Sequence, residues 1–159
     1  MDIKKVLESG RVSRYHATLI DKKQTVDIHS WEVAVVLRHI YPNCSRDLLF
    51  YALTHDSAEI YTSDIAAPVK KRNPELKEVF DRMEDEYILE TLKIVHPEFS
   101  TEEKLAVKYA DIISGIYFTT CRVMAGDREA FPIRDKWLEY VGSLPYLNKA
   151  TRETIEDLK

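Results

Sequence analysis

The sequence predicts an all-α protein that forms a single domain. Glycine and proline, which interrupt helices, are few, at 4 and 6 of 159 residues. Apolar residues recur mostly at intervals of three and four, which is the spacing of one helix face. A chain of this length with 45% apolar and 31% charged residues can bury a sizeable core. We therefore expect residues 1–159 to fold as one helical unit.

The N-terminal part is predicted to be a short helix followed by an irregular arm. The helix covers residues 3–8 and ends at Gly10, which tolerates the positive φ common at helix ends. Residues 11–27 have weak periodicity and many polar side chains, so we expect them to be extended or irregular. Arg14 and Tyr15 in this arm offer a cation beside an aromatic ring. Without a ligand site elsewhere, they would belong to an ordinary solvated loop.

A second helix is predicted to begin near Asp27, with Thr25 or Asp27 as its N-cap, and to end at Pro42. One face of this helix is formed by His29, Val33, Val36, Leu37 and Ile40. His29 therefore lies in the first turn of the core-facing stripe. An imidazole in that position needs a hydrogen-bond partner or a metal ion.

A third helix is predicted to be capped by Ser45 and to cover residues 47–61. Asp56 shares its apolar face with Leu49, Ala52, Leu53 and Ile60. A core-facing carboxylate must be paired, hydrogen-bonded or bound to a metal, and His55 lies only about 100° around the helix. Glu59, four residues after His55, shares its stripe and could act there as an acid or base. Taken alone, a His-Asp pair is more often a satisfied polar pair than a metal site.

The next segment is predicted to be a connector followed by a long amphipathic helix over residues 74–95. The connector holds Asp64 and three consecutive basic residues that begin with Lys70. Such a charge run is usually solvated, although one of its cations could also contact a phosphate group.

The last helix with a chemical signal is predicted to begin at Ser100 or Thr101, with an acidic residue behind the cap. Between residues 109 and 121 its only charged side chain is Asp111. A carboxylate on a central helix must be neutralised there. His29 and Asp56 are also ionisable side chains on apolar helix faces. One shared ion would explain why all three residues occupy such positions.

The overall composition excludes several classes of function. A net charge of −4 gives no reason to expect binding to nucleic acid or to an anionic membrane. Cys44 and Cys121 have neither metal-type nor redox-type spacing, so any metal would be held by nitrogen and oxygen atoms. No apolar run is long enough for a membrane span. We therefore expect a cytoplasmic protein.

The candidate residues occur in the order H…HD…D, which resembles the HD-domain metal-dependent phosphohydrolases. Three further stretches carry the resemblance: Arg14-Tyr15, residues 26–30 and residues 55–70. Together they closely resemble the 5′-deoxynucleotidase branch, meaning the YfbR-like enzymes and their phage-encoded relatives. The similarity covers about residues 7–123, the expected HD core, and residues 124–159 form a C-terminal helical extension without a family motif.

The resemblance implies an HD-domain helical bundle around one central metal site. By that resemblance His29, His55, Asp56 and Asp111 would be the metal ligands, and Glu59 would position or deprotonate the attacking water. Two imidazoles and two carboxylates suit one divalent transition metal, such as Co, Mn or Zn, with Mg as an alternative.

The resemblance also implies how the substrate is held. Arg14 and Lys70 would bind phosphate oxygens, and Asp64 would accept a hydrogen bond from the 3′-hydroxyl of the sugar. Tyr15, at a position where the family commonly has tryptophan, would pack on the deoxyribose and exclude a 2′-hydroxyl.

The first functional hypothesis is the metal-dependent hydrolysis of 2′-deoxynucleotide 5′-phosphates with release of phosphate. Within the enzymes, the alternative is a base-selective deoxynucleoside triphosphohydrolase of the phage dATP type. A third hypothesis is a nucleotide-binding regulatory module without turnover, and Glu59 disfavours it because simple binding needs no acid or base. In each case we expect a small deoxynucleotide as the partner and a homo-oligomeric protein.

Overall fold

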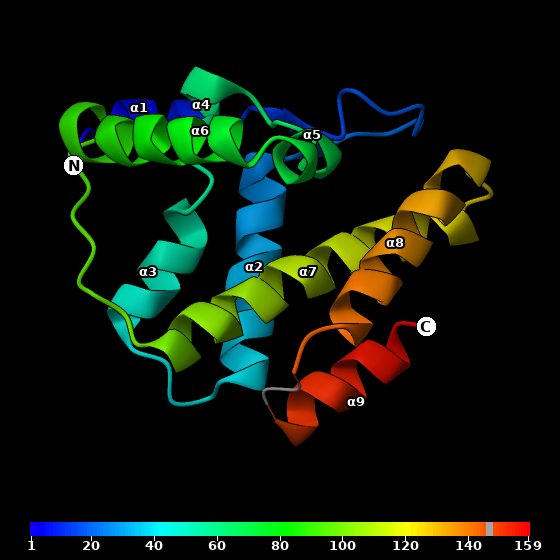
Figure 1. Cartoon of the computed structure of the whole chain (residues 1–159). Helices are drawn as coiled ribbons and strands as arrows, with labels where there is room; N and C mark the ends of the chain where they lie inside the picture. The colour runs from blue at the N-terminus through cyan, green and yellow to red at the C-terminus, as the bar shows by residue number, and fades with distance from the viewer. Residues whose placement is uncertain (146–147) are drawn as a thin grey trace.

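The structure, a computed structural model, describes residues 1–145 and 148–159. It is built on two helices that cross and pack against each other, α2 (Val26–Ile40) and α7 (Thr101–Met124). Figure 1 shows α2 running behind the long diagonal of α7. Helix α3 (Arg46–Thr54) packs on α2, and α8 (Phe131–Gly142) packs on α7. The prediction of an all-α fold is confirmed, since helices make up most of the described chain.

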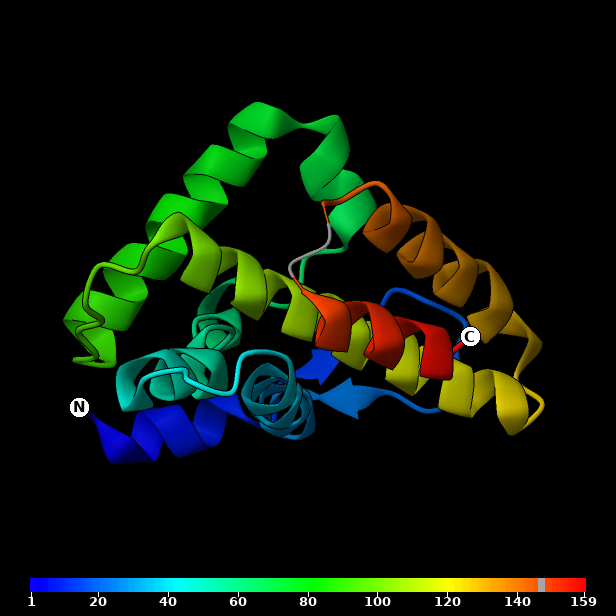
Figure 2. The same cartoon turned by 90° about the horizontal axis from the view of Figure 1, so that it is seen from below.

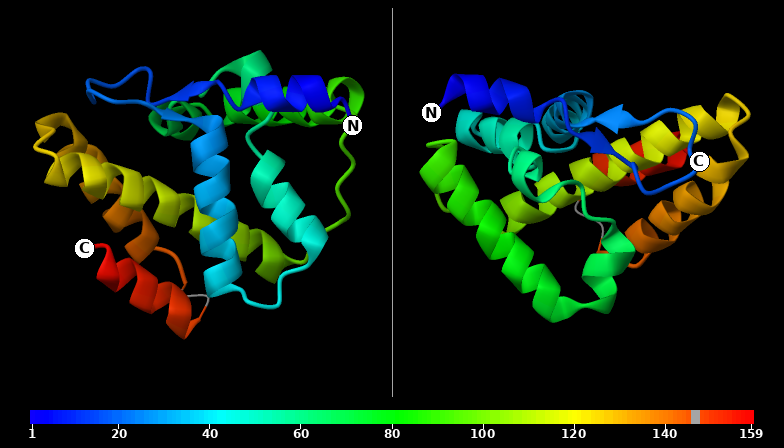
Figure 3. Two further views of the ribbon diagram at one scale, coloured as in Figure 1. Left: turned by 180° about the vertical axis from the view of Figure 1, so that it is seen from behind. Right: turned by 90° about the horizontal axis from the view of Figure 1, so that it is seen from above.

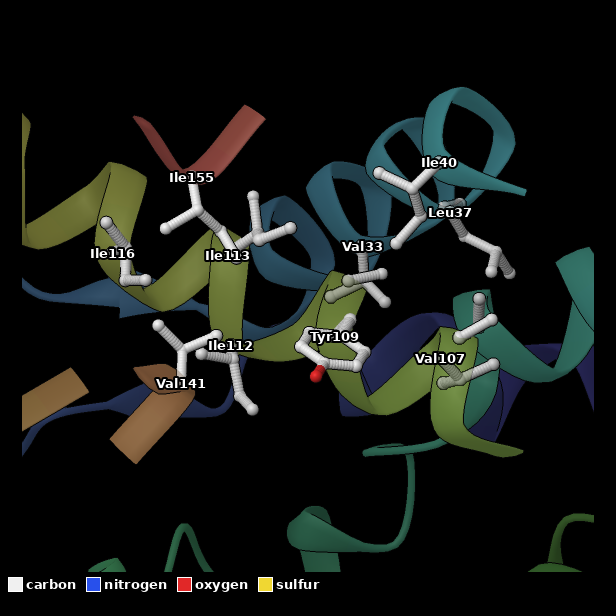
Figure 4. Close-up of a cluster of buried hydrophobic side chains, with 14 of the residues drawn as sticks. Val33, Leu37, Ile40, Val107, Tyr109, Ile112, Ile113, Ile116, Val141 and Ile155 are labelled. Atoms are coloured by element: carbon white, nitrogen blue, oxygen red, sulfur yellow. The ribbon is translucent and has the colours of Figure 1, made fainter. Parts of the chain in front are cut away.

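The hydrophobic core lies at the crossing of α2 and α7. Its large buried side chains include Val33, Leu37 and Ile40 of α2, and Val107, Tyr109, Ile112, Ile113 and Ile116 of α7 (Figure 4). Each such side chain contributes about 1.5–3 kcal/mol when it leaves water. Because His29 and Asp111 lie on these same two helices, the packing of the core also fixes the distance between them.

The C-terminal residues share this core. Val141 of α8 and Ile155 of α9 (Lys149–Asp157) are 3% and 1% exposed and join the same apolar cluster. A short 3₁₀ turn at Arg128–Ala130 connects α7 to α8. In Figure 2, α8 and α9 flank α7 along its second half.

The N-terminal helix α1 (Ile3–Ser9) ends beside Gly10, but not for the reason that the sequence suggested. The φ of Gly10 is −58°, so the expectation of a positive φ is wrong. A Cβ atom at this position would lie 2.9 Å from the Cβ of Asp27. Glycine is therefore needed because another segment of the chain approaches closely.

The predicted irregular arm is confirmed and contains a small hairpin. Its strands, β1 (Ser13–Arg14) and β2 (Gln24–Thr25), are antiparallel, with Arg14 opposite Gln24. Figure 3 shows the hairpin beside the N-terminal end of α2. Since β2 leads directly into α2 and Arg14 pairs with Gln24 of β2, the hairpin holds Arg14 near that end of the helix.

The predicted helix over residues 47–61 is interrupted at the His-Asp pair. After α3, residues 55–58 form turns, and a short helix α4 (Glu59–Thr62) follows. Backbone bonds from Ser57 N to Thr54 O and from Glu59 N to Asp56 O, both 3.0 Å, tighten this segment. The proposed apolar stripe is also partly wrong, because Leu53 and Ile60 are 46% and 38% exposed. The predicted N-cap is confirmed, since Ser45 accepts a bond from the backbone of Leu48.

The charged middle of the chain forms α5 (Ala67–Arg72), α6 (Pro74–Glu86) and a π-helical turn at Tyr87–Thr91. The predicted helix over residues 74–95 is thus correct as far as residue 91. Beyond it, Lys93 takes a φ of 56° and the chain continues without helix to Ser100.

The start of α7 is the predicted capping box. Ser100 Oγ accepts a bond from the backbone of Glu103, whose carboxylate accepts one from the backbone of Ser100. Although α7 is long, no helix within the described part of the chain is apolar enough over a sufficient length to cross a membrane.

Candidate functional site

The structure brings the four predicted metal ligands together from three elements. His29 lies in the first turn of α2, His55 and Asp56 follow α3, and Asp111 lies in the middle of α7. Single ligand atoms of His29, His55 and Asp111 all lie within 4.8 Å of one another. His29 Nε2 is 3.1 Å from Asp111 Oδ1 and 3.4 Å from Asp56 Oδ2, and His55 Nε2 is 3.3 Å from Asp56 Oδ1. Such spacings are compatible with one ion between these atoms, at ligand distances of about 2 Å.

The two imidazoles present the same ring atom to the centre of this cluster. His55 Nδ1 is 2.8 Å from the carbonyl oxygen of Ala52, which can only accept, so Nδ1 carries the proton and Nε2 the lone pair. Nε2 of both His29 and His55 is buried and has no hydrogen-bond partner among the described residues. Orphaned acceptors that face carboxylates are the arrangement a cation would satisfy, so these residues fit a metal ion.

The surroundings of the site lower the pKa values of both Asp111 and His29. Burial would raise the pKa of Asp111, but contact with His29 and the charge of Arg14 outweigh it and keep that pKa well below its usual range. Burial lowers the pKa of His29, which favours the neutral imidazole that a metal ion requires.

Arg14 is the cation of the cluster. Its guanidinium Nη1 donates to Asp56 Oδ2 at 2.7 Å, and Nη2 lies 3.8 Å from Asp111 Oδ1. The side chain is only 11% exposed. Arg14 therefore neutralises part of the negative charge of two predicted ligands while facing the same centre.

Glu59 occupies a buried position at the start of α4, with 9% of its surface exposed. Burial, and then the charge of Asp56, raise the pKa of its carboxyl group to about 9. Its Oε2 atom has no hydrogen-bond partner among residues 1–145 and 148–159. A buried carboxyl group with an elevated pKa next to a cluster of predicted ligands is a candidate acid or base.

Tyr15 and Asp64, two predicted substrate contacts, are in contact with each other. The backbone N–H of Tyr15 donates to Asp64 Oδ2 at 2.8 Å. The backbone φ of Tyr15 is 59° and that of Ser63 is 64°, so both partners lie in or beside strained segments. The Tyr15 ring stacks on Phe118 of α7, with centroids 5.1 Å apart.

Lys70 lies at the edge of the cluster. Its Nζ is 3.8 Å from Glu84 Oε1 of α6, and its side chain is 26% exposed. Its charge lowers the pKa of Glu59, although burial of Glu59 has the larger and opposite effect. Lys70 is thus close enough to Glu59 to affect its pKa, and it also pairs with the Glu84 carboxylate.

A pocket of about 270 Å³ opens beside the cluster, and sequence reasoning missed two of its cations. It is lined by Tyr51, His55, Lys104, Val107, Lys108 and Asp111. Lys104 and Lys108 precede Asp111 by seven and three residues, which is the spacing of one helix face, and this spacing is the signal that could have found them. Lys108 Nζ also lies 5.4 Å from the centre of the Tyr140 ring of α8.

Two crossed helices and a turn bring the predicted histidine and aspartate ligands together, with the buried Glu59 beside them. This arrangement defines an HD-domain phosphohydrolase. The chain belongs to the YfbR-like 5′-deoxynucleotidase family, whose model matches residues 6–141. The predicted family membership is thereby confirmed.

Comparison with individual proteins agrees with this membership. The chain is 25% identical over 133 residues to the 5′-deoxynucleotidase PM0747 of Pasteurella multocida, covering 68% of this chain and 67% of that protein. The fold is similar to that of the HD phosphohydrolase DatZ of cyanophage S-2L, solved with dA and one catalytic Zn²⁺ ion. That match has a TM-score of 0.69 and 17% identity over 99% of this chain and 93% of DatZ. The PH0347 protein of Pyrococcus horikoshii gives a TM-score of 0.72 at 18% identity, over 99% and 96% of the two chains.

Proposed function

We propose that this protein hydrolyses 2′-deoxynucleotide 5′-phosphates and releases phosphate, with one divalent metal ion held by His29, His55, Asp56 and Asp111. The observation that carries the proposal is the convergence of two unpartnered imidazole Nε2 atoms on two carboxylates. The name of the Pasteurella multocida relative and the dA bound to DatZ support a deoxynucleotide as the substrate.

The donor set favours cobalt, manganese or zinc, with magnesium as the weaker alternative. Imidazole nitrogen suits Zn and similar ions, whereas Mg prefers oxygen ligands and retains several waters. When bound, such an ion would polarise the phosphoryl oxygens and make a water molecule more acidic near neutral pH. The Zn²⁺ ion in DatZ supports zinc as the first metal to test.

Glu59 would take the proton of the attacking water. Its pKa of about 9 reflects burial first and the charge of Asp56 second. Neutralisation of Asp56 by a bound cation removes that second cause, so the carboxyl group becomes a base at a lower pH. General acid–base groups of this kind typically contribute about 10²–10⁴ in rate.

Arg14 would supply the fixed positive charge for the phosphoryl group. Its guanidinium is buried against Asp56 and Asp111, so it is already oriented before substrate binds. Stabilisation of negative charge spread over phosphoryl oxygens is most of what phosphoryl transfer requires. Lys70 would add a second cation from the side of Glu59.

Tyr15 and Asp64 would bind the sugar as a pair. Because Asp64 Oδ2 holds the backbone of Tyr15, the second carboxylate oxygen remains available for the 3′-hydroxyl. In this arrangement Asp64 contacts the sugar and also determines where the Tyr15 ring lies.

The pocket beside the cluster favours a second candidate, the hydrolysis of deoxynucleoside triphosphates. Lys104 and Lys108 line the same 270 Å³ space as His55 and Asp111, where they could bind the additional phosphates of a triphosphate. A base-selective triphosphohydrolase would use the same metal ligands and release a polyphosphate.

A product assay with metal-reconstituted protein tests these proposals. Protein stripped with a chelator is reloaded with Zn²⁺, Co²⁺, Mn²⁺ or Mg²⁺ and incubated with matched deoxy- and ribonucleoside mono- and triphosphates. Metal-dependent formation of deoxynucleoside and inorganic phosphate from monophosphates is the expected result. Formation of tripolyphosphate from triphosphates supports the second candidate, and nucleotide binding without any turnover supports a regulatory module.

Two histidine variants provide the matched control. His55→Ala should lose metal-dependent turnover because it removes a ligand. His39→Ala removes an exposed histidine of α2 that lies outside the cluster and should leave turnover unchanged. Equal activity of the His55 variant and wild type would contradict the proposed metal centre.

A further inference from the structure

A chain of hydrogen bonds runs behind His29, away from the proposed metal position. His29 Nδ1 is 3.0 Å from Ser114 Oγ, and Ser114 Oγ is 2.7 Å from Glu32 Oε2. Gln24 Nε2 donates to the same glutamate oxygen at 2.8 Å. His29, Ser114 and Gln24 are each at most 1% exposed, so the bond between His29 and Ser114 is shielded from water, whereas Glu32 at the end of the chain is half-buried.

We propose that Glu32 and Ser114 are positioning residues that fix the ring and the tautomer of His29 and thereby set the metal affinity of the site. The inference rests on the proposed metal-dependent function and extends it to residues that make no contact with the metal or the substrate.

The direction of each hydrogen bond follows from the groups involved. An ionised glutamate can only accept, so the single proton of the Ser114 hydroxyl points to Glu32. Ser114 Oγ is then left as an acceptor, and His29 Nδ1 must donate to it. The proton of the neutral ring therefore lies on Nδ1, and the lone pair of Nε2 faces Asp56 and Asp111.

The other neutral tautomer of His29, with its proton on Nε2, shows why the bonds to Ser114 and Glu32 matter for metal binding. Without Ser114, a proton on His29 Nε2 could bond to Asp111 Oδ1, which is only 3.1 Å away. That proton would occupy the position proposed for the metal ion and would have to leave before the ion could bind. The bonds to Ser114 and Glu32 disfavour this state, because it would leave the Glu32 oxygen with fewer donors.

The network also links the elements that carry the site. Glu32 follows His29 by three residues on α2, and Ser114 follows Asp111 by three residues on α7. Each helix therefore supplies one proposed ligand and one supporting group to the crossing. Gln24 lies opposite Arg14 in the hairpin, so the bond to Glu32 also holds the strand beside that arginine.

The effect of Ser114 and Glu32 on metal affinity should be of the size seen for other groups that orient a metal-binding histidine. Groups that orient a metal-binding histidine typically change metal affinity by about 10–100-fold when they are removed. We expect Ser114→Ala to weaken Zn²⁺ binding by that factor. Glu32→Gln keeps an oxygen acceptor for Ser114 but loses the charge that raises the basicity of the imidazole, so it should weaken binding by less.

The experiment measures Zn²⁺ affinity by competition with a chromogenic chelator in wild type and in both variants. Thr119→Val is the matched control, because Thr119 is also buried on α7 and, within the described part of the chain, its hydroxyl bonds only to the Gly115 and Ile116 carbonyls of its own helix. The control should bind Zn²⁺ like wild type. Equal Zn²⁺ affinity of Ser114→Ala and Thr119→Val would overturn the proposal.

A spectroscopic measurement on the metal-free protein separates this inference from the proposed function. Long-range ¹H–¹⁵N correlation spectra at neutral pH should place the His29 proton on Nδ1 in wild type and move it toward Nε2 in Ser114→Ala. A wild-type proton on Nε2 would overturn the positioning role even if Zn²⁺ binds. A wild type that binds no Zn²⁺ would instead refute the proposed metal centre, and the tautomer would still report on Ser114. Should Ser114→Ala fail to fold, Glu32→Gln gives the same readouts.

Discussion

The guanidinium of Arg14 donates to the carboxylate of Asp56 at 2.7 Å, although 42 positions separate the two residues in the sequence. The same guanidinium lies 3.8 Å from Asp111. One buried cation thus compensates two carboxylates that are also proposed to hold a metal ion. Both Arg14 and the ion would reduce the repulsion between the Asp56 and Asp111 carboxylates. Their effects should therefore be coupled, because the loss of one makes the other more important.

This coupling predicts a stability effect that depends on metal. Removing one partner of a buried ion pair leaves an uncompensated charge, so Arg14→Met should lower the free energy of unfolding of the metal-free protein by about 3 kcal/mol. With saturating Zn²⁺ the difference from wild type should shrink, since the ion neutralises both carboxylates. Urea unfolding with and without Zn²⁺ measures both quantities.

Arg122→Met is the control for this prediction. Arg122 pairs with Asp21 at 3.6 Å, but the Asp21 side chain is 64% exposed. Such a pair is worth about 0–1 kcal/mol, and its loss should not depend on Zn²⁺. An Arg14→Met deficit that is the same with and without Zn²⁺ would show that Arg14 and the ion do not share the carboxylates.

The second prediction concerns the proton acceptor. Glu59→Gln preserves the size of the side chain but removes its basicity, so turnover should fall by about 10²–10⁴ while Zn²⁺ remains bound. Phosphate release and metal content are measured on the same preparation. Near-normal turnover would identify Glu59 as a structural acid, and loss of the metal would identify it as a ligand.

The third prediction concerns pH in the metal-free protein. The pKa of Glu59 rises from an ordinary value of 4.5 to about 9 on folding, so the folded state keeps a proton that the unfolded state has already lost. Stability must then fall as the pH rises between these two values. From roughly pH 7 to 9 the free energy of unfolding should decrease by up to about 1.4 kcal/mol per pH unit.

Comparison with Glu59→Gln isolates this effect. In the window above pH 7 His29 does not contribute, because burial lowers its pKa below the ordinary 6.5. The glutamine variant should therefore have a flatter profile than wild type in urea unfolding. Parallel profiles for the two proteins would contradict the elevated pKa.

The fourth prediction concerns sugar discrimination. If the Tyr15 ring packs on C2′, a ribonucleotide must displace the ring or be misplaced relative to the attacking water. A misplacement of about 1 Å can reduce the rate roughly a hundredfold. Tyr15→Ala should therefore raise activity on ribonucleotides relative to deoxynucleotides. The test is the ratio of kcat/KM for a deoxynucleotide to kcat/KM for the matching ribonucleotide. An unchanged ratio would mean that Tyr15 does not discriminate between the two sugars.

The fifth prediction follows from the bond between Asp64 and Tyr15. Asp64→Ala removes an acceptor for the Tyr15 backbone, which is held at a φ of 59°, and a proposed contact to the 3′-hydroxyl. It should lower kcat/KM on deoxynucleotides and also weaken discrimination against ribonucleotides. Asp64→Asn keeps an oxygen acceptor and should retain most of both properties. Loss of activity in Asp64→Ala with an unchanged sugar ratio would indicate that Asp64 acts on the 3′-hydroxyl alone.

The sequence by itself determined the features that depend on near neighbours. The Ser45 cap, the Ser100–Glu103 capping box and the apolar faces of α2 and α7 all follow from residues three or four positions apart. His29 and Asp111 stand out in the sequence for the same reason, as ionisable groups on apolar helical faces. The end of the third predicted helix was missed, because the turns after Thr54 do not interrupt the apolar pattern.

Only the tertiary structure decided which side chains meet across the site. The bond between Tyr15 and Asp64 spans 49 residues, and the one between His29 and Ser114 spans 85. In each pair, no sequence pattern around one residue indicates that it contacts the other. Their contact depends on the crossing of α2 with α7 and on the path of the hairpin, which the packing of the whole core establishes. Periodicity indicates which face of a helix is buried, whereas the partner that the face meets is a property of the folded chain.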